Sequence, residues 1–418
     1  MIEKNIQNYF FIFFLFIPIS IVLGPTVSLI NLLIIDLFFL IFFFNKIKIN
    51  CFDNQSIKVL LLIYFYLIIN TLLAVDKEIT LGRNLGFLRF IVFFIFINYF
   101  YNFFYKEKKF FNFWTLLISI VILDIYIEFF LGSNTFGWGS RFIDGVEQPN
   151  GRRIVSFFKD EPIAGAFISG FIFMIFGYLL KKFEANKLIP LMFIFIAFLS
   201  ILLTGERSNT IKVFIGLLVF FSLLDFIDLK NKILIFFSIF LICFLSIFSF
   251  DFLKNRYVGL FKIFNSKEKI KFQFENNSYF KLYKSGYYIF KDNIFFGVGN
   301  KNYRIKSCEF AFDKKNLEAN KYVCSTHPHQ IYFEFLSEHG LFGSIILLAS
   351  LFYLIFKILR EIIESRNYIQ LGCFIFVILN FVPVLPSGAF FSDFNSTIFW
   401  LNFSIMFACN KKTNIFKL

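Results

Sequence analysis

ILIFFSIFLICFLSIFSF, residues 233–250, is an apolar run without a single charged side chain. A helix needs roughly 20 apolar residues to cross about 30 Å of hydrocarbon, and this run approaches that length. Residues 9–23 and 369–385 are uncharged in the same way. Hydrophobic residues make up 58% of the 418 positions, and phenylalanine alone occupies 73 of them, far above the usage of soluble domains. The sequence therefore predicts an integral membrane protein.

Apolar stretches alternate with short charged ones along the chain, which predicts an all-α protein of about twelve transmembrane helices. The stretch that follows the first eight residues is too long for a cleavable signal peptide, so it is expected to remain as the first helix. The range 84–104 is the weakest, because Arg83 and Arg89 lie near its start. The expected helices lie near 9–23, 27–44, 58–74, 84–104, 110–131, 163–180, 188–203, 210–227, 233–250, 341–356, 369–386 and 396–409.

The 42 Lys and Arg against 28 Asp and Glu give a net charge of +14. They lie between the apolar runs and form no continuous stripe with aromatic residues, which argues against a nucleic-acid partner. Loops rich in Lys and Arg are typical of the cytoplasmic side. Because twelve is even, both termini are expected there, with two long periplasmic segments, 132–162 and 251–340, on the other side. The basic groups are Lys46/Lys48/Lys58, Lys106/Lys108/Lys109, Lys181/Lys182/Lys187, Lys230/Lys232, Lys357/Arg360/Arg366 and Lys411/Lys412/Lys417.

Of the six cysteines, only Cys308 and Cys324 share the larger periplasmic segment. An oxidising compartment would permit a disulfide between them, closing a loop of about 17 residues worth roughly 3 kcal/mol. Two free thiols are the alternative. The sequence has no C-x-x-C pair, so a zinc site of the usual spacing, or another metal site, is not expected.

The three histidines of the chain, His327, His329 and His339, lie within a short stretch where the large segment returns to the membrane. Pro328 disfavours helix at the residue before it, so the first two histidines are expected in a rigid turn. The stretch QIYFEFLSEHGLFG (330–343) then reads as an interfacial helix that ends at His339–Gly340. Each histidine could instead be a hydrogen-bonded interfacial residue.

Charged residues at a membrane edge are functional candidates, because burying charge there is costly. Arg152, Arg153 and Glu161 precede the span at 163–180, Arg207 lies in the turn TGERSNT (204–210), and Arg304 follows GVGNKNY (297–303). The planar guanidinium group matches a pair of phosphate oxygens, which suggests a phosphate ligand. A neutral imidazole nearby could take a proton from a hydroxyl nucleophile. The alternative is that the arginines only anchor helix ends.

Four stretches resemble the O-antigen ligase family, which includes the WaaL-type ligases and is related to the Wzy-type polymerases. RRIVSFFKDEPIAGAF (152–167) is similar to its arginine-led segment and LLTGERSNTIKVFIGLLVF (202–220) to its T-G-x-R turn. FKDNIFFGVGNKNYR (290–304) resembles its N-P-x-x-G-x-G segment, and HPHQIYFEFLSEHGLFG (327–343) its motif beginning H-x-H-N. This chain has Gln330 in place of Asn and Ile294 in place of Pro. The arginine expected early in the large loop is not obvious at 279–284.

The resemblance implies an inverting, metal-independent glycosyltransferase of lipopolysaccharide biosynthesis in the inner membrane, without a cofactor. A hydroxyl of lipid A-core would attack the anomeric carbon of a glycan carried on undecaprenyl diphosphate. His329 would be the catalytic residue, and Glu338 structural. The diphosphate ligands would be Arg207 and either Arg152 or Arg153. The remaining substrate-binding candidates are Glu161, His327 and Arg304.

Two other functions stay open at this stage. A Wzy-type polymerase would use the same donor with a second lipid-linked glycan as acceptor. A transporter or a flippase for lipid-linked glycans would need charged or broken helices near the midplane. Asp124 and Asp225 each lie within an expected span.

Overall fold

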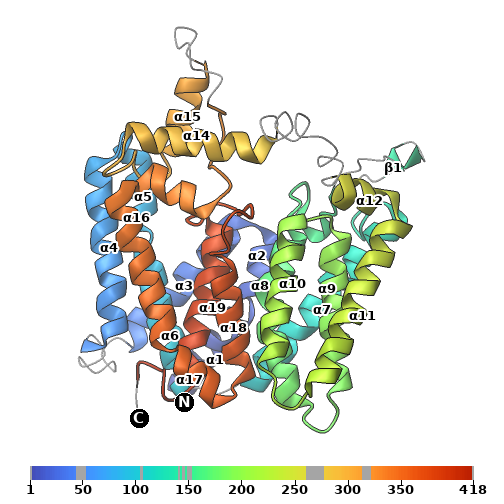
Figure 1. The fold of residues 1–418 in the computed structure, drawn as a ribbon. Coiled ribbons are helices and arrows are strands. Elements are labelled where there is room, and N and C mark those ends of the chain that lie inside the picture. The colour runs from blue at the N-terminus through green and yellow to red at the C-terminus, as the bar shows by residue number, and fades with distance from the viewer. Residues whose placement is uncertain are drawn as a thin grey trace.

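A computed structural model describes residues 2–43, 53–103, 107–139, 142–143, 146–147, 153–259, 277–312 and 322–416. Long helices stand side by side in a bundle, and shorter elements form a layer across one end of it (Figure 1). The first helix begins and the last helix ends at the opposite end. Each of the twelve expected ranges coincides with a helix or a pair of helices, so the predicted helical architecture is confirmed.

The N-terminal elements are α1 (Ile2–Leu15), α2 (Ile17–Leu23), α3 (Pro25–Phe43), α4 (Gln55–Leu73), α5 (Lys77–Leu85), α6 (Leu88–Phe103) and α7 (Glu107–Leu131). A pair of two-residue antiparallel strands follows, β1 (Phe142–Ile143) and β2 (Val146–Glu147), then the 3₁₀ turn η3 (Ser156–Phe158). The next helices are α8 (Ala164–Lys182), α9 (Leu188–Leu203), α10 (Arg207–Ser222), α11 (Leu229–Ser249) and α12 (Asp251–Tyr257). The chain ends with α14 (Ser278–Asp292), α15 (Tyr303–Phe312), α16 (Ile331–Lys357), α17 (Leu359–Ser365), α18 (Tyr368–Leu379) and α19 (Asp393–Ala408).

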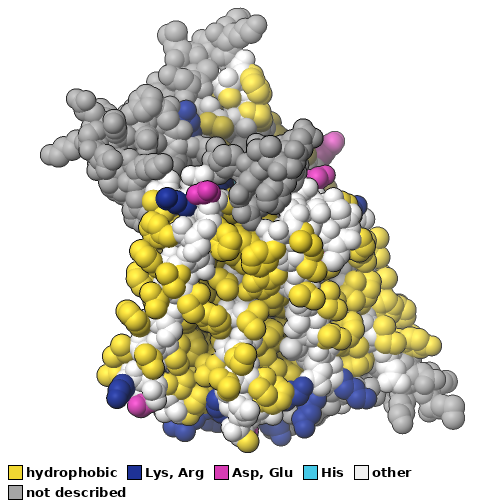
Figure 2. Space-filling model, turned by 90° about the vertical axis from the view of Figure 1, so that its right-hand side faces the viewer, with side chains coloured by type: hydrophobic (Ala, Val, Ile, Leu, Met, Phe, Trp, Pro, Cys, Tyr) yellow, Lys and Arg dark blue, Asp and Glu magenta, His cyan; other side chains and the backbone are white. Residues whose placement is uncertain are grey.

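Seven helical stretches in the described residues are long and apolar enough to cross a membrane. They are α3, α4, α5 with α6, α7, α8, α11, and α16 with α17. α9 and α18 are apolar but shorter, so the number twelve stays a prediction. Figure 2 shows a band of hydrophobic side chains over one face of the bundle, with Lys and Arg gathered along its lower edge.

The range expected to be the weakest span is two helices, α5 and α6, that meet near Gly86. Arg83 and Arg89 both donate to one carboxylate oxygen of Asp393, at 3.2 and 2.6 Å. Asp393 opens α19. A partly buried ion pair of this kind removes much of the cost of placing two arginines near the apolar region, so the break forms without leaving unpaired charge.

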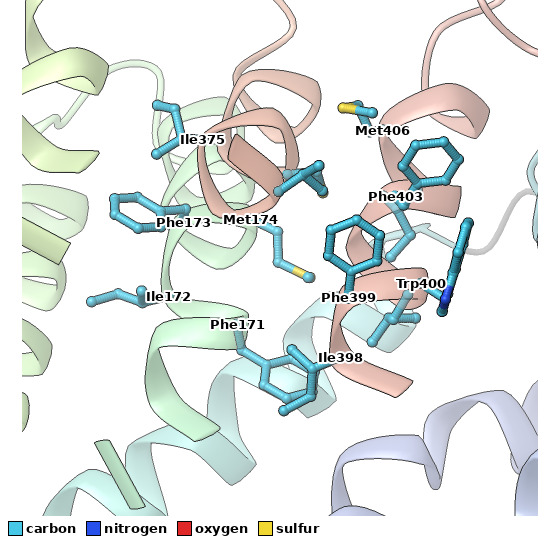
Figure 3. Packing of buried hydrophobic residues seen from close by; sticks show 14 of the residues in the cluster. Phe171, Ile172, Phe173, Met174, Ile375, Ile398, Phe399, Trp400, Phe403 and Met406 are labelled. Atoms are coloured by element: carbon cyan, nitrogen blue, oxygen red, sulfur yellow. The ribbon is translucent and has the colours of Figure 1, made fainter. Parts of the chain in front are cut away.

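α8 is the central helix of the bundle, and almost all of its residues are buried. It packs against α18, α9 and α7. A side chain at Gly177 would collide with the carbonyl oxygen of Tyr368, and one at Gly372 with that of Phe173. Small residues let helix backbones approach closely in this way. Aromatic and aliphatic side chains from α8, α18 and α19 fill the adjoining core (Figure 3).

The predicted interfacial helix and the following span form one element, α16, with a kink inside it. Gly340 has φ 64° and ψ −167°, which is not helical. A side chain there would overlap the backbone of Phe295. The break therefore needs glycine, because the left-handed region and the close approach both exclude a Cβ. The predicted end at His339–Gly340 is confirmed.

A network of asparagines fastens the turn 297–302 to α4 and α5. The Asn300 backbone N–H donates to the side chain of Asn70 at 2.9 Å, and its amide donates to Asn84 at 2.7 Å. Asn302 accepts from the backbone N–H of Asp76 at 2.9 Å. All four asparagines are buried. Buried polar groups are retained where they satisfy one another, so this turn has a fixed position above the membrane helices.

Cys308 and Cys324 form a disulfide, with the sulfur atoms 1.98 Å apart. Cys308 belongs to α15, and Cys324 lies in the segment that leads to His327. The bond therefore ties the turn with the two histidines to the helix beside it.

Replacing both cysteines with serine is expected to lower the free energy of unfolding by roughly 3 kcal/mol, because the unfolded chain regains the freedom that the cross-link removes. Thermal unfolding of the purified protein in detergent measures the change. A reductant should lower the melting temperature of the wild type and leave that of the Cys308→Ser, Cys324→Ser variant unchanged. Equal melting temperatures without reductant would contradict the prediction.

Candidate active site

A cavity of about 560 Å³ lies between α8, α10, α18 and α19, close to α12 and α14. Its size is in the range of small-molecule sites. α14 lies across the end of the bundle above these helices (Figure 1). Five of the residues predicted from the sequence line this single cavity: Arg153, Glu161, Arg207, His327 and His329. Segments far apart in sequence thus meet where the chemistry would need them.

Arg153 reaches the cavity because the residues after it are fastened to two helices. The N–H groups of Val155 and Ser156 donate to the buried carboxylate of Glu128 on α7, with Ser156 at 2.6 Å. The N–H of Ile154 donates to the carbonyl of Thr204 at the end of α9, at 3.3 Å. Arg152, the alternative phosphate ligand, lies outside the described residues.

Arg207 is the first residue of α10, and it contacts an arginine that the sequence motifs did not identify. Its Nη1 donates to the carbonyl of Arg256 on α12 at 3.2 Å. The Nη2 of Arg256 donates in turn to the carbonyl of Gly205 at 3.2 Å. Arg256 also lines the cavity. It lies in the long segment 251–340, earlier in the sequence than 279–284, where an arginine was expected.

The three arginines concentrate positive charge at one wall of the cavity. Within the described residues none of them forms an ion pair with a carboxylate within 4 Å. Burial lowers the pKa of Arg256, and the positive charges of Arg207 and Arg153 lower it further. Repulsion of this kind is relieved when an anion binds between the guanidinium groups. The wall is therefore suited to phosphate or another compact polyanion.

His329 has a left-handed backbone conformation, with φ 56°. Its carbonyl accepts a hydrogen bond from the N–H of Ser387 at 2.8 Å, which holds the turn against the segment between α18 and α19. The ring lies 3.9 Å from that of His327 and 5.9 Å from that of Tyr279, centroid to centroid. Tyr279 also lines the cavity. Non-glycine residues rarely adopt this conformation, and strained residues of this kind are often found at active sites.

Both histidines are neutral at pH 7. Burial lowers the pKa of His329, and the charge of Arg153 lowers it further. Burial likewise lowers the pKa of His327 to about 3, with a smaller contribution from His329. A neutral imidazole has a free ring nitrogen that can accept a proton. The ring of His329 can thus serve as a base in a cavity rich in positive charge.

Glu206 lines the cavity beside the arginines and is buried. Its carboxylate accepts hydrogen bonds from the N–H groups of Gly165 and Ala166 at the start of α8, at 2.7 and 3.2 Å. Asn209 donates a third. Burial raises the pKa of Glu206 to about 7, although these hydrogen bonds and the charge of Arg153 oppose the rise. The carboxylate positions the arginine-bearing turns against the first turn of α8.

Because the pKa of Glu206 is higher in the folded than in the unfolded protein, the folded state binds more protons. The contribution of Glu206 to stability should therefore fall as pH rises from about 4.5 to about 7. Glu206→Gln removes this titration, so the melting temperature of the variant should fall less between pH 4.5 and pH 7.5 than that of the wild type. Thermal unfolding at several pH values measures the difference, and identical slopes would remove Glu206 from this role.

Other predicted residues lie away from the cavity. Arg304 does not line it, although its charge acts on His327 and on Glu338. Glu338 is buried and accepts from the N–H of Tyr303 at 3.2 Å, which agrees with the structural role implied for it. His339 is fully buried, with Nδ1 3.1 Å from the hydroxyl of Tyr66.

The substitution at position 330 has a structural explanation. The side-chain oxygen of Gln330 accepts from the N–H groups of Tyr332 and Phe333, at 2.8 and 3.0 Å. It therefore caps α16, as asparagine does at helix N-termini. The glutamine keeps the start of the helix fixed next to His329.

Comparison with known proteins bears on this arrangement. Residues 191–348 match the family model Wzy_C, described as O-antigen ligase. This stretch, less than half of the chain, is similar to the O-antigen ligase family. The match includes the arginines of α10 and α12 and both cavity histidines, while Arg153 and the segment 384–388 lie outside it. No curated protein matches the chain. The O-antigen ligase resemblance of the sequence is therefore confirmed for the part of the chain that holds most of the site.

Proposed function

We propose that the protein is an O-antigen ligase that moves a glycan from undecaprenyl diphosphate to lipid A-core at the periplasmic face of the inner membrane. The family match supports glycosyl transfer of the ligase or polymerase type. One observation carries the proposal furthest. His329 meets Arg153, Arg207 and Arg256 in one cavity, although these residues come from four separate parts of the chain.

The proposed reaction is a single displacement. The acceptor hydroxyl attacks the anomeric carbon, the bond from that carbon to the phosphate oxygen breaks, and the configuration inverts. The hydroxyl proton passes to the neutral ring of His329. The electron pair of the broken bond leaves with the diphosphate, whose negative charge the arginines stabilise. Fixed guanidinium groups would thus do the work that a divalent cation does in other transferases, and no metal is invoked.

The distribution of charge supports a periplasmic site. Lys and Arg gather at the end of the bundle where the first helix begins and the last helix ends (Figures 1 and 2). Positive charge is typical of cytoplasmic loops, which gives cytoplasmic termini. The cavity and the disulfide then lie on the other side, where an oxidising environment allows the bond. In this orientation the segments 132–162 and 251–340 would lie on the periplasmic side.

Asp124 and Asp225, the two residues named for a transporter, do not support that function. Asp124 accepts hydrogen bonds from the hydroxyl of Ser156 at 2.6 Å and from that of Thr135 at 2.7 Å, so it organises the loop before α8. Asp225 is exposed and pairs with Arg366 at 2.9 Å. These two acidic residues therefore have structural partners, whereas a transport pathway needs ionisable groups that face a passage through the bilayer.

The test uses the full chain reconstituted in lipid with an undecaprenyl diphosphate-linked glycan. Lipid A-core and a second molecule of lipid-linked glycan are offered as acceptors in separate reactions. A ligase transfers glycan to lipid A-core, and a polymerase instead lengthens the chain on the lipid carrier. Product on the carrier alone would overturn the ligase assignment in favour of the polymerase, and no product with either acceptor would overturn both.

A further inference from the structure

Lys212 is a fourth cation in the cavity, and neither the family motifs nor the proposed mechanism assigns it a role. It lies on α10 and lines the cavity together with Arg207. With a rise of about 1.5 Å per residue, its Cα is roughly 7.5 Å farther along the helix, toward the membrane interior. A lysine at such a depth is costly unless it has an anionic partner or reaches water.

No described residue supplies that partner. Lys212 forms no ion pair or hydrogen bond within the described part of the chain. The cavity wall near it is apolar, with Phe173 from α8 and Phe376 and Leu379 from α18. The ammonium group is therefore free to meet a ligand that enters the cavity.

The direction of the helix brings this lysine toward the arginines. Side chains in an α-helix lean toward its N-terminus, and the N-terminus of α10 is at Arg207. The stem of Lys212 thus extends from its Cα back toward the level of Ser208, which also lines the cavity. Lys212 and Arg207 therefore line the same cavity from successive turns of α10, with Lys212 on the deeper turn.

We propose that Lys212 binds the lipid-side phosphate of the donor, while the three arginines bind the glycan-side phosphate. This inference rests on the proposed function, because it assumes a lipid diphosphate. The two phosphates of such a donor differ in depth, since one carries the glycan and the other carries the polyprenyl chain. The deeper cation then meets the deeper phosphate, and the chain continues along the apolar wall.

The charges in the cavity agree with a diphosphate. Arg153, Arg207, Arg256 and Lys212 contribute four positive charges. Glu161 and Glu206, when ionised, offset two of them. A diphosphate diester carries about two negative charges and neutralises the rest, so removing Lys212 leaves one phosphate oxygen without a counter-charge in an apolar environment.

The experiment measures binding of two lipids to the full chain in nanodiscs: a polyprenyl diphosphate and the matching polyprenyl monophosphate. The monophosphate contains only the lipid-side phosphate. Lys212→Met keeps the apolar stem and removes the charge, and it should weaken binding of both lipids by about tenfold or more, the usual value of a charge-assisted hydrogen bond. Lys212→Arg should retain most of the affinity.

The matched control is Lys254→Met, an exposed lysine on α12 that does not line the cavity. It should leave both affinities unchanged. Arg207→Lys should weaken the diphosphate more than the monophosphate, because its partner is the other phosphate. If Lys212→Met binds the monophosphate as tightly as the wild type does, the inference is overturned, whether or not diphosphate binding falls. Unchanged binding of both lipids is the result expected of a lysine that only reaches toward water.

Thermal unfolding of each variant separates lost binding from lost folding, and Lys212→Gln provides a second uncharged variant should the methionine variant unfold. The outcome is also separable from that of the proposed function. If the wild type transfers glycan and Lys212→Met binds both lipids as tightly as the wild type, this inference alone is refuted. A protein that transfers no glycan to either acceptor refutes the proposed function, whatever the lysine does.

Discussion

His329→Ala is expected to lower the rate of glycan transfer by about 10²- to 10⁴-fold, the usual contribution of a positioned general base. The ring lies in the arginine-lined cavity, and its pKa is lowered by burial and by Arg153, so it is neutral and able to accept the acceptor proton at pH 7. The loss should appear in kcat, measured with reconstituted protein and saturating donor. Activity equal to that of the wild type would remove this histidine from the mechanism.

His339→Ala is the matched control in the same helix region. This ring is fully buried against Tyr66 and does not line the cavity. Its loss should lower stability, and the rate per folded molecule should change much less than in His329→Ala.

The pH profile gives an independent readout for the same residue. Because the pKa of His329 lies below its ordinary value of 6.5, transfer by the wild type should persist below pH 6.5 and decline only as the ring becomes protonated. His329→Gln should lose this acid limb together with most of its activity. A wild-type rate that begins to fall on acidification while the pH is still above 7 would contradict the lowered pKa.

Arg207→Lys keeps the positive charge and is nevertheless expected to lower kcat/KM by about 10²-fold. Lysine lacks the planar fork that holds two phosphate oxygens at once. It would also lose the hydrogen bond from Arg207 to the carbonyl of Arg256, which fixes the two turns together. The lost contact matters more in the transition state than in the ground state, because charge builds on the departing diphosphate. The kcat should therefore fall along with donor affinity.

Arg360→Lys makes the same substitution at an exposed arginine on α17, where the side chain pairs with Glu364. Its transfer rate should equal that of the wild type. If Arg207→Lys is as active as this control, the guanidinium of Arg207 is not a diphosphate ligand.

The helices could be predicted from the sequence because their signal is local. An apolar run of sufficient length specifies a membrane helix wherever it packs, and all twelve expected ranges contain helices. The break in α16 was also visible, because the pair His339–Gly340 combines a polar residue with one that can adopt φ 64°. Even the paired arginines of the weak range, Arg83 and Arg89, marked a real interruption.

The cavity was only partly predictable, because its wall is assembled by tertiary contacts. Arg256 lies on a helix of seven residues, and its place follows from hydrogen bonds between α12 and the turn at Gly205. No local pattern announces such a contact. The position of Arg256 soon after the span at 233–250 could have indicated it, whereas the family resemblance pointed only to residues 279–284.

Lys212 was missed for a different reason. It falls close to the first residue of the expected span 210–227, and lysines near the ends of spans commonly reach toward water. Arg304, which a motif singled out, does not line the cavity and follows the turn that the asparagines hold. Both cases depend on side-chain direction, which the sequence pattern does not contain.

The asparagine network between α4, α5 and the turn 297–302 joins the N-terminal part of the chain to the region that matches the family. Residues 191–348, which match the family, include Asn300 and Asn302, whereas Asn70 and Asn84 lie in the N-terminal third. A fragment that began at residue 191 would lose these hydrogen bonds, together with the helices that cover the turn. The matched region therefore relies on α4 and α5, which lie outside it, to hold its turn 297–302 in place.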